Sequence, residues 1–572
     1  MIAKKLTIDY LKKGYLRGEF TVEDICREII KRADAARDMN IWIVPPDMSL
    51  IMPYLEQLKS CDITSLPLWG IPFAVKDNID VANVPTTAGC KTYAYTPDES
   101  ATVVQLLIEA GAIPIGKTNL DQFATGLVGT RSIHGAVHNA LNAQLISGGS
   151  SSGSAVAVAV GQAAFSLGTD TAGSGRVPAA LNNLVGLKPT CGAWSTTGVV
   201  PACESLDCVT VFTHILSDAD AVDKILRVHD IKCGYSKQTN QLTPKLPKKI
   251  CIPAETPEFY GTFEKEYRSA WERALEKIKS TGIPVEPIDC GIFKEAAAML
   301  YDGPWIAERW SSLGEFVTNN NGRGMVEVTE SILKSGNRPE LRADDVFRVI
   351  HRLAQIKAET RELLADSVLI LPTAGGTYTI EQVNADPVRT NSNMGLYTNH
   401  CNLLDLSALN FPAGWADENL PFGITSFALS GEDGLNVGLA QAYELHEMIP
   451  IAVCGLHMRG MPLEHQLTDL GAIFIRESAT TAEYKLYKLN TTPVKPGLVR
   501  VADGGTSIAL ELWNIPAHNL GAFVTNISSP LGLGKIALES GEYVTGFVCE
   551  SYAAADATDV SHLKSFRNVL RV

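Results

Sequence analysis

The sequence predicts an α/β protein with a mixed central β-sheet flanked by helices, followed by a smaller, strand-rich α+β domain. Up to about residue 430, amphipathic helical segments alternate with short apolar runs. After about residue 445, short strand-like runs separated by turn residues replace this alternation. A chain of 572 residues is long enough for more than one domain. We therefore expect one domain over 1–445 and a second over 446–572.

The first elements follow from periodicity and end signals. Residues 7–39 carry apolar positions at helical spacing, and Thr21 with Asp24 forms a variant of the capping box. The apolar run at 66–80 predicts a buried strand between turn residues. Residues 101–123 then predict a helix, a turn at Gly111 and a short strand ending near Lys117.

The same alternation continues toward the second domain. Helices are expected at 263–281 and 343–365, each followed by a strand, with a last strand and loop at 418–434 and a connecting helix at 439–450. In the second domain we expect strands at 451–458, 474–478, 484–490, 498–515, 521–527 and 543–551. Hairpin turns are expected at 503–505 and 540–541.

Composition excludes several classes of function. The formal net charge of −14, without a basic run, argues against nucleic-acid binding. The longest apolar stretch, 155–167, is too short to span a bilayer and predicts a buried core helix, and the first twenty residues lack the apolar segment of a secretory signal. Twelve cysteines without CxxC pairs, and without histidines at zinc-ligand spacing, predict free thiols and no metal in a reducing, cytoplasmic compartment.

Two glycine-rich loops carry the strongest chemical signal. Ser150 lies in GGSSSGS and Ser174 in GTDTAGSGR, and the first loop leads directly into small apolar residues at helical spacing. A flexible linker is the alternative interpretation of the first loop, and a simple helix-capping turn that of the second. The N–H groups of Thr171, Ala172 and Gly173 are suited to converge on a developing oxyanion.

A serine nucleophile needs a base, and Lys76 follows the predicted strand at 66–80. Burial would lower the pKa of its amine toward neutrality and make it able to accept a proton. Ser150 would then relay the proton between Lys76 and Ser174. The alternative for a single lysine after a strand is an ordinary surface charge.

Residues 68 to about 200 resemble the amidase signature family. The resemblance rests on Lys76 in GIPFAVKDN, on Ser150 and Ser174 in the loops above, and on GLKPT at 186–190. It implies a Ser-Ser-Lys triad, a cis peptide before Ser150, and Asp170 and Arg176 as supports of the nucleophile loop. Ala172 stands where the family usually has a glycine, a mild departure because this residue contributes its backbone.

Three further stretches resemble the allophanate-hydrolysing members of that family: YDGPWIAERW at 301–310, residues 390–414, and VCGLHMRGMPLEHQL at the start of the second domain. The resemblance implies that Tyr301 and Arg309 hold the substrate carboxylate and that Gly126 contacts the substrate through its backbone. A guanidinium can bind a carboxylate with two hydrogen bonds. An amphipathic surface helix is the alternative for 301–310.

The second domain resembles a gamma-glutamyl-cyclotransferase-like barrel, associated in this branch with decarboxylation of the intermediate N-carboxycarbamate. His457, His465 and Glu511 fall in the matching stretch. Structural roles are the alternative for all three. The resemblance further implies a homodimer, no cofactor, and functional association with urea carboxylase. His400 stands where similar sequences carry an aromatic residue, with packing and pocket polarity as the two interpretations.

Two other functions stay open at this point. One is an amidase of different specificity, such as a glutamyl-tRNA amidotransferase-like subunit, against which the acidic charge and the second domain weigh. The other is a non-catalytic scaffold that binds a partner such as urea carboxylase, which the intact triad opposes. The sequence leaves open whether the allophanate comes from urea or from triazine breakdown.

Overall fold

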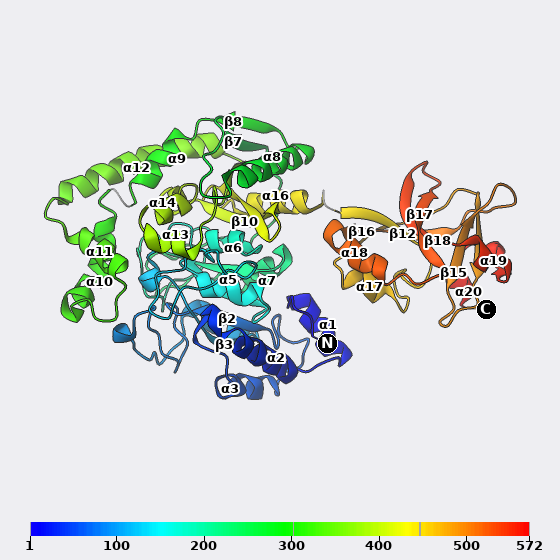
Figure 1. The fold of residues 1–572 in the computed structure, drawn as a ribbon, viewed down its shortest axis with the longest axis horizontal. Helices are drawn as coiled ribbons and strands as arrows, with labels where there is room; N and C mark the ends of the chain where they lie inside the picture. Colours follow the sequence, from blue (N-terminus) through cyan, green and yellow to red (C-terminus); the bar gives the residue numbers. More distant parts are fainter. Residues whose placement is uncertain (1, 301–302, 446–447, 571–572) are drawn as a thin grey trace. The chain divides into compact units, whose positions relative to one another are not determined.

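The computed structural model describes residues 2–300, 303–445 and 448–570. It divides into two compact units, Met1–Ala442 and Tyr443–Val572, which are described separately (Figure 1).

A large mixed sheet forms the centre of the first unit. Within the described residues it has eleven strands in the spatial order β1-β3-β2-β4-β6-β5-β10-β11-β9-β7-β8. Strand β2 pairs in parallel with β3 and β4, and β7 pairs in parallel with β8 and β9, while the remaining pairs are antiparallel. The strands are β1 (Trp42–Val44), β2 (Pro72–Lys76), β3 (Ile113–Thr118), β4 (Phe165–Asp170), β5 (Val185–Lys188), β6 (Cys208–Thr213), β7 (Lys249–Pro253), β8 (Val285–Ile288), β9 (Ser367–Pro372), β10 (Ser407–Asp417) and β11 (Leu420–Ala428). The mixed sheet confirms the predicted fold class.

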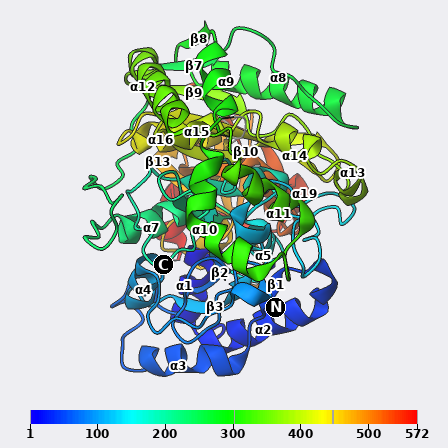
Figure 2. The same ribbon diagram turned by 90° about the vertical axis from the view of Figure 1, so that its left-hand side faces the viewer.

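Helices flank this sheet. They are α1 (Ile8–Arg17), α2 (Val22–Ala35), α3 (Met48–Leu58), α4 (Thr102–Glu109), α5 (Ser152–Ala159), α6 (Val177–Leu181), α7 (Leu216–Leu226), α8 (Glu264–Ser280), α9 (Gly291–Ala298), α10 (Ile306–Asn320), α11 (Glu327–Lys334), α12 (Ala343–Leu364), α13 (Ile380–Ala385), α14 (Arg389–Met394), α15 (His400–Leu403) and α16 (Asp433–Leu445). Helices α10 and α11 pack against each other on the outside of the unit, below α12 (Figures 1 and 2). None of the helices within the described ranges has the length and apolar character needed to cross a membrane.

Most predicted elements of this unit are present. Thr21 and Asp24 form the expected reciprocal cap of α2, and α8 and α12 are each followed by the expected strand. The stretch 155–167 differs from the prediction of one core helix. Helix α5 ends at Ala159, and the apolar residues from Phe165 onward form β4. Gly161, with φ +74°, turns the chain where a Cβ would lie 2.0 Å from the backbone oxygen of Lys4, so the helix cannot continue.

The second unit is strand-rich, as predicted. Within its described residues, a sheet of order β13-β16-β12-β18-β17 lies beside a smaller sheet of order β15-β14-β19. The strands are β12 (Met448–Val453), β13 (Ile473–Ala479), β14 (Tyr484–Lys488), β15 (Pro496–Arg500), β16 (Ala509–Pro516), β17 (Leu531–Ala537), β18 (Tyr543–Cys549) and β19 (Thr558–Asp559), and the helices are α17 (Glu464–Thr468), α18 (Ala517–Thr525), α19 (Ser551–Ala555) and α20 (Phe566–Val569).

Two predictions for this unit are wrong, and two bounds differ, because β12 begins at Met448, inside the helix expected at 439–450, and ends at Val453, before the end of the strand expected at 451–458. The segment expected as a strand at 521–527 belongs largely to helix α18, because Leu520, Phe523 and Ile527 have helical spacing and pack on the core of the unit. The turn at 503–505 does not close a hairpin, because β15 pairs with β14 whereas β16 pairs with β12 and β13. The turn at 540–541 does connect the antiparallel pair β17 and β18.

Candidate active site

Lys76 is the last residue of β2, and its side chain is completely buried. The ammonium nitrogen donates hydrogen bonds to Ser150 Oγ at 2.8 Å and to Thr169 Oγ1 at 2.7 Å. Thr169 comes from β4, which lies beside β2 in the sheet. A lysine at the end of a central strand is therefore held in place by two hydroxyl groups, rather than exposed to solvent.

Burial lowers the pKa of Lys76 from 10.5 to about 7, although the carboxylates of Asp121, Asp207 and Asp170 oppose this shift. The ammonium form loses its hydration on burial, and the hydroxyl groups that replace water carry no compensating charge. A large fraction of the amine is therefore unprotonated near neutral pH and able to accept a proton.

Ser150 lies in the loop that precedes α5, and the Gly149–Ser150 peptide bond is cis, as the family resemblance implied. The loop passes close to its neighbours. A Cβ on Gly149 would lie 2.1 Å from Asp121 Oδ2, and one on Gly148, with φ +73°, would lie 2.9 Å from the backbone of Pro178. The glycines of GGSSSGS are therefore required by close approach, and the loop is ordered, not a flexible linker.

Ser174 lies in the loop that follows β4, and its hydroxyl donates to the backbone oxygen of Gly126 at 3.5 Å. This loop is built around a buried ion pair. Asp170 accepts from Arg176 Nε at 2.9 Å and from the N–H groups of Gly173 and Gly175 at 2.8 and 3.0 Å. Burial raises the pKa of Asp170, but Arg176 outweighs it and holds the pKa below its usual value.

The three N–H groups expected to form an oxyanion hole differ in their surroundings. The Gly173 N–H is already bonded to Asp170, so it would have to exchange that acceptor to serve an oxyanion. Those of Thr171 and Ala172 have no acceptor among the residues that the structure describes. Around them, the Thr171 hydroxyl donates to Asp207, and the Ala172 oxygen accepts from Thr398 Oγ1 at 2.7 Å. The N–H groups of Thr171 and Ala172 are therefore the two of the three that do not already have an acceptor within the described residues.

Arg309, on α10, is 1% exposed, and its Nη1 donates to Thr125 Oγ1 at 3.2 Å. The next residue, Gly126, accepts the Ser174 hydroxyl. The structure thus brings the buried guanidinium of Arg309 and the hydroxyl of Ser174, the predicted nucleophile, into contact with two adjacent residues. A Cβ on Gly126 would lie 2.6 Å from Asp121 Oδ2, so the backbone approach there depends on glycine. Tyr301 lies outside the described residues.

Four residues of this region escaped the sequence analysis: Asp121, Thr125, Thr169 and Asp207. Thr169 lies within the quoted motif around Ser174, but only strand pairing places it beside Lys76. The Asp121 carboxylate accepts from the N–H groups of Val128, Gly129 and Arg131 and so shapes the turn next to Gly126. No pattern in the sequence signals the contact of Thr169 with Lys76, which joins residues 93 positions apart. The contacts of the Asp121 carboxylate lie within ten residues of it.

His400 packs in an aromatic cluster. Its ring centroid lies 5.2 Å from that of Phe293 and 4.7 Å from that of Phe427, and Arg176 lies over the Phe427 ring. Burial and the nearby Arg176 lower the pKa of His400 to about 3, so the imidazole is neutral. Of the two interpretations, the structure favours packing.

In the second unit the three titratable residues lie in different surroundings. Glu511 is buried and accepts from Arg459 and Arg567, at 3.3 and 2.9 Å, which makes it part of an ion-pair network. His465 lies on α17, and its Nδ1 contacts the backbone oxygen of Pro462 at 2.9 Å. His457 lines a cavity of about 190 Å³, and the described lining of this cavity includes neither His465 nor Glu511.

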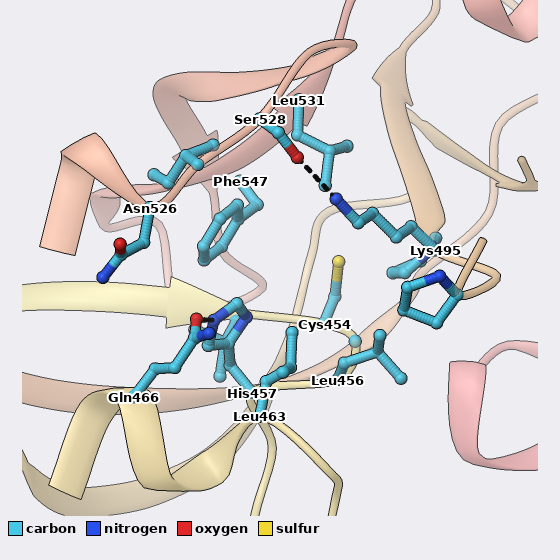
Figure 3. A pocket seen from close by; sticks show the side chains of 15 residues that line it. Cys454, Leu456, His457, Leu463, Gln466, Lys495, Asn526, Ser528, Leu531 and Phe547 are labelled. Atoms are coloured by element: carbon cyan, nitrogen blue, oxygen red, sulfur yellow. Dashed lines mark hydrogen bonds between the residues drawn. The ribbon is translucent and has the colours of Figure 1, made fainter. Parts of the chain in front are cut away.

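Figure 3 shows the cavity around His457. The imidazole is 2.9 Å from Gln466 Oε1 and stacks on Phe547 with a centroid distance of 5.0 Å. On the other side, the Lys495 ammonium donates to Ser528 Oγ at 2.7 Å. Burial lowers the pKa of His457, with Gln466 opposing the shift. A neutral imidazole and an ammonium group facing one small cavity suit a small anionic ligand.

No cluster of three or more His, Cys, Asp or Glu side chains in the described ranges is arranged to hold a metal ion. All twelve cysteines are free thiols.

The fold and the site define an amidohydrolase, and the chain belongs to the amidase family. The amidase family model matches residues 24–436, and the model of the allophanate hydrolase C-terminal domain matches residues 449–571. Among individual relatives, the chain is 41% identical to the urea amidolyase of Lachancea kluyveri over 95% of its own length and 39% identical to that of Saccharomyces cerevisiae over 92%. It spans about a third of the length of these two relatives, 32% and 31% respectively.

Solved structures extend the similarity to both units. The allophanate hydrolase of Kluyveromyces lactis matches with a TM-score of 0.72 and 37% identity, over 99% of each chain. One subunit of the glutamyl-tRNA(Gln) amidotransferase of Thermotoga maritima matches over 77% of this chain and 94% of its own, with a TM-score of 0.62 and 25% identity. The similarity to the first protein therefore includes the second unit.

Proposed function

We propose that this enzyme hydrolyses allophanate (urea-1-carboxylate) through a Ser-Ser-Lys triad formed by Lys76, Ser150 and Ser174. The observation that carries the proposal is the contact of 2.8 Å between the buried Lys76 amine and the Ser150 hydroxyl, in a fold that also buries Arg309 beside the segment facing Ser174. The amine supplies the base, and the guanidinium supplies a charge complementary to the substrate carboxylate.

The reaction begins when neutral Lys76 draws a proton through Ser150, and Ser174 attacks the terminal carbamoyl carbon. The oxyanion is stabilised by the N–H groups of Thr171 and Ala172, with Gly173 joining if it releases Asp170. Ammonia leaves with the proton returned by the relay, and the substrate remains bound to Ser174 as an acyl ester. Water then cleaves this ester and produces N-carboxycarbamate.

Three residues are assigned to substrate binding. Arg309 is proposed to hold the carboxylate, with Tyr301 donating beside it, and Gly126 to contact the substrate through its backbone. Support for Arg309 comes from its position, because its guanidinium donates to Thr125, the residue before Gly126, whose backbone oxygen accepts the Ser174 hydroxyl. A guanidinium can bind a carboxylate with two hydrogen bonds.

The second unit is proposed to accelerate the loss of carbon dioxide from N-carboxycarbamate, with His457 in the cavity as its central residue. The net reaction then yields two ammonia and two carbon dioxide per allophanate. Glu511 is given a structural role in this proposal, because two arginines already neutralise it, and His465 does not line the cavity.

Domain bounds, location and partners are also proposals. We assign the domains to 1–445 and 446–572 and place the protein in the cytoplasm. We further propose a homodimer and functional association with a urea carboxylase that supplies allophanate. The urea amidolyase relatives are about three times as long as this chain, which supports a second activity working with this one. Light scattering of the purified protein tests the homodimer.

The decisive experiment measures ammonia release from allophanate, biuret, a malonamate-type acid and a neutral amide side by side. We expect hydrolysis of allophanate to be preferred and the Ser174→Ala variant to be inactive on every substrate. Preference for the neutral amide would favour the alternative of a general amidase, to which the amidotransferase relatives point. Unchanged ammonia release by Ser174→Ala would refute the nucleophile, and no release by the unaltered protein would favour a scaffold.

A further inference from the structure

A second cavity, of about 260 Å³, lies in the first unit between the end of β5 and the region of α12 and α15. Cys191, Lys237 and Lys357 line it, together with Asp207 and Asn402. The proposed hydrolysis uses none of the first three. This cavity is unlike an apolar packing defect, because it gathers two ammonium groups, two carboxylates and a thiol. Lys237 forms an ion pair with Asp405 at 2.7 Å.

Lys188 lies next to Cys191, and its side chain is completely buried. Its ammonium donates to the backbone oxygen of Pro189 at 2.9 Å and to Cys191 Sγ at 3.5 Å. Neither acceptor is a carboxylate. A buried ammonium needs nearby negative charge, and the groups that act on Lys188 are Cys191, Cys208, Cys401 and Asp170. Of these four, Cys191 has a side chain in hydrogen-bond contact with the ammonium.

Cys191 has two close polar neighbours. Its Sγ accepts from the Lys188 ammonium at 3.5 Å and lies 3.9 Å from the backbone oxygen of Leu206. The contact with Lys188 favours the thiolate, because an adjacent ammonium stabilises the negative charge on sulfur. A hydrogen bond from Cys208 and the charge of Lys188 lower the pKa of Cys191, while burial raises it. The charged or titratable groups that act on Cys191 are Lys188, Cys208, Lys237, Asp405, Lys357, Arg176 and Cys401.

The cavity also has an unsatisfied polar group. Asn402 is 3% exposed, and its Oδ1 has no hydrogen-bond partner among the described residues, while its Nδ2 donates to the backbone oxygens of Asp170 and Leu206. Lys357 also lines the cavity, and burial lowers its pKa while the charge of Asp405 opposes this shift. Both observations indicate a cavity prepared for a small polar or anionic molecule beside the thiolate.

We propose that Cys191 is a reactive thiolate and a modification site for small electrophiles, of which hydroperoxides are the class that fits the cavity. The sulfur attacks the terminal oxygen of the peroxide, so that an S–O bond forms and the O–O bond breaks. The leaving hydroxide or alkoxide takes up a proton from water or from a lysine ammonium of the cavity, and the product is the sulfenic acid of Cys191.

Modification at this position is coupled to the nucleophile loop. Asp207 and Asn402, which line the same cavity, accept the Thr171 hydroxyl and donate to the Asp170 backbone oxygen, respectively. An added oxygen or alkyl group on Cys191 competes for this space and displaces these supports. Modified protein should therefore release ammonia more slowly. This consequence rests on the proposed function, but the modification itself does not.

Limited alkylation with iodoacetamide tests the reactivity, read by peptide mass and therefore independent of any substrate. Cys290 is the internal control, because it is also partly exposed and burial raises its pKa to about 11. At pH 7 we expect Cys191 to react at least about tenfold faster than Cys290, since the thiolate fraction outweighs its lower intrinsic nucleophilicity. Equal rates, or a Cys191 rate that rises only above pH 8, would overturn the proposal.

Lys188→Met should slow the alkylation of Cys191 about tenfold or more and move its pH midpoint upward. The pH profile of the unaltered protein gives the same information if this variant does not fold. Hydrogen peroxide followed by a sulfenic-acid trap should label Cys191, and the loss of ammonia release that accompanies labelling should be absent in Cys191→Ser but present in Cys290→Ser. Labelling of Cys191 without any loss of ammonia release would contradict the coupling and leave only the modification site.

Discussion

The Lys76 amine lies 2.8 Å from the Ser150 hydroxyl, although 74 residues separate the two in the sequence. The contact forms because β2 delivers Lys76 to the end of a central strand, while the loop before α5 crosses that end with its glycines. Burial of Lys76 at this strand end places its amine against the Ser150 hydroxyl and also lowers the pKa of the amine.

The pH dependence of hydrolysis should follow this amine. With a pKa of about 7, Lys76 is protonated and unable to act as a base below that pH. We expect kcat/KM for allophanate to fall about tenfold per pH unit below 6 and to level off above 8. A profile that is flat from pH 5 to 9 would contradict a role for Lys76 as the base.

Lys76→Met removes the base but keeps the volume of the side chain. Ammonia release should fall by about 10³-fold or more, in line with the loss of a general base and its relay. In the unfolded protein Lys76 has its ordinary pKa of 10.5, whereas in the folded protein its pKa is about 7. Between these pH values the unfolded state binds the proton and the folded state does not, so the free energy of unfolding decreases as the pH falls through this range. The variant should lack this component, which thermal unfolding at pH 7 and pH 9 can measure.

Arg309 should determine preference for the carboxylate. Arg309→Ala should raise KM for allophanate about 10- to 100-fold, while hydrolysis of a neutral amide changes much less, because only the first substrate loses a charged hydrogen bond. Steady-state kinetics on both substrates measure the difference. Equal losses on both would indicate that Arg309 acts through Thr125 and the surrounding structure.

The ion pair of Asp170 and Arg176 should matter for folding as well as for the loop. Arg176→Met leaves a buried carboxylate without its partner and should cost about 3–5 kcal/mol of unfolding free energy. Arg268→Met is a suitable control, because Arg268 pairs with Glu264 on an exposed helix face, where such a pair contributes about 0.5 kcal/mol or less. Urea denaturation compares the two variants, and similar losses would count against a supporting role for the buried pair.

The proposed role of His457 predicts a change in stoichiometry. The His457→Asn variant should release the first ammonia at the normal rate, because the triad lies in the other unit, but the second with a delay. A coupled assay that follows ammonia over time measures both phases. Two ammonia released without delay would remove His457 from the decarboxylation.

The sequence alone was sufficient for the class of fold and for the chemistry expected of three residues. Alternation of helical and apolar segments predicts the mixed sheet, and the two serine loops with Lys76 match a family pattern. Predictions from periodicity were wrong for two short apolar segments. The segment 155–167 was expected as one helix but contains the end of α5 and the start of β4, and 521–527 was expected as a strand but lies mostly in α18.

The tertiary structure decided which groups meet and in which protonation state. Thr169 reaches Lys76 through strand pairing, and the Asp121 N–H donates to the backbone oxygen of Ser150 at 3.0 Å. Asp170 already holds the Gly173 N–H that the sequence pattern had assigned to an oxyanion. A sequence pattern records spacing along the chain, whereas burial and contacts between distant segments arise only when the sheet assembles. The pKa of Lys76, on which the proposed chemistry depends, is a property of that burial.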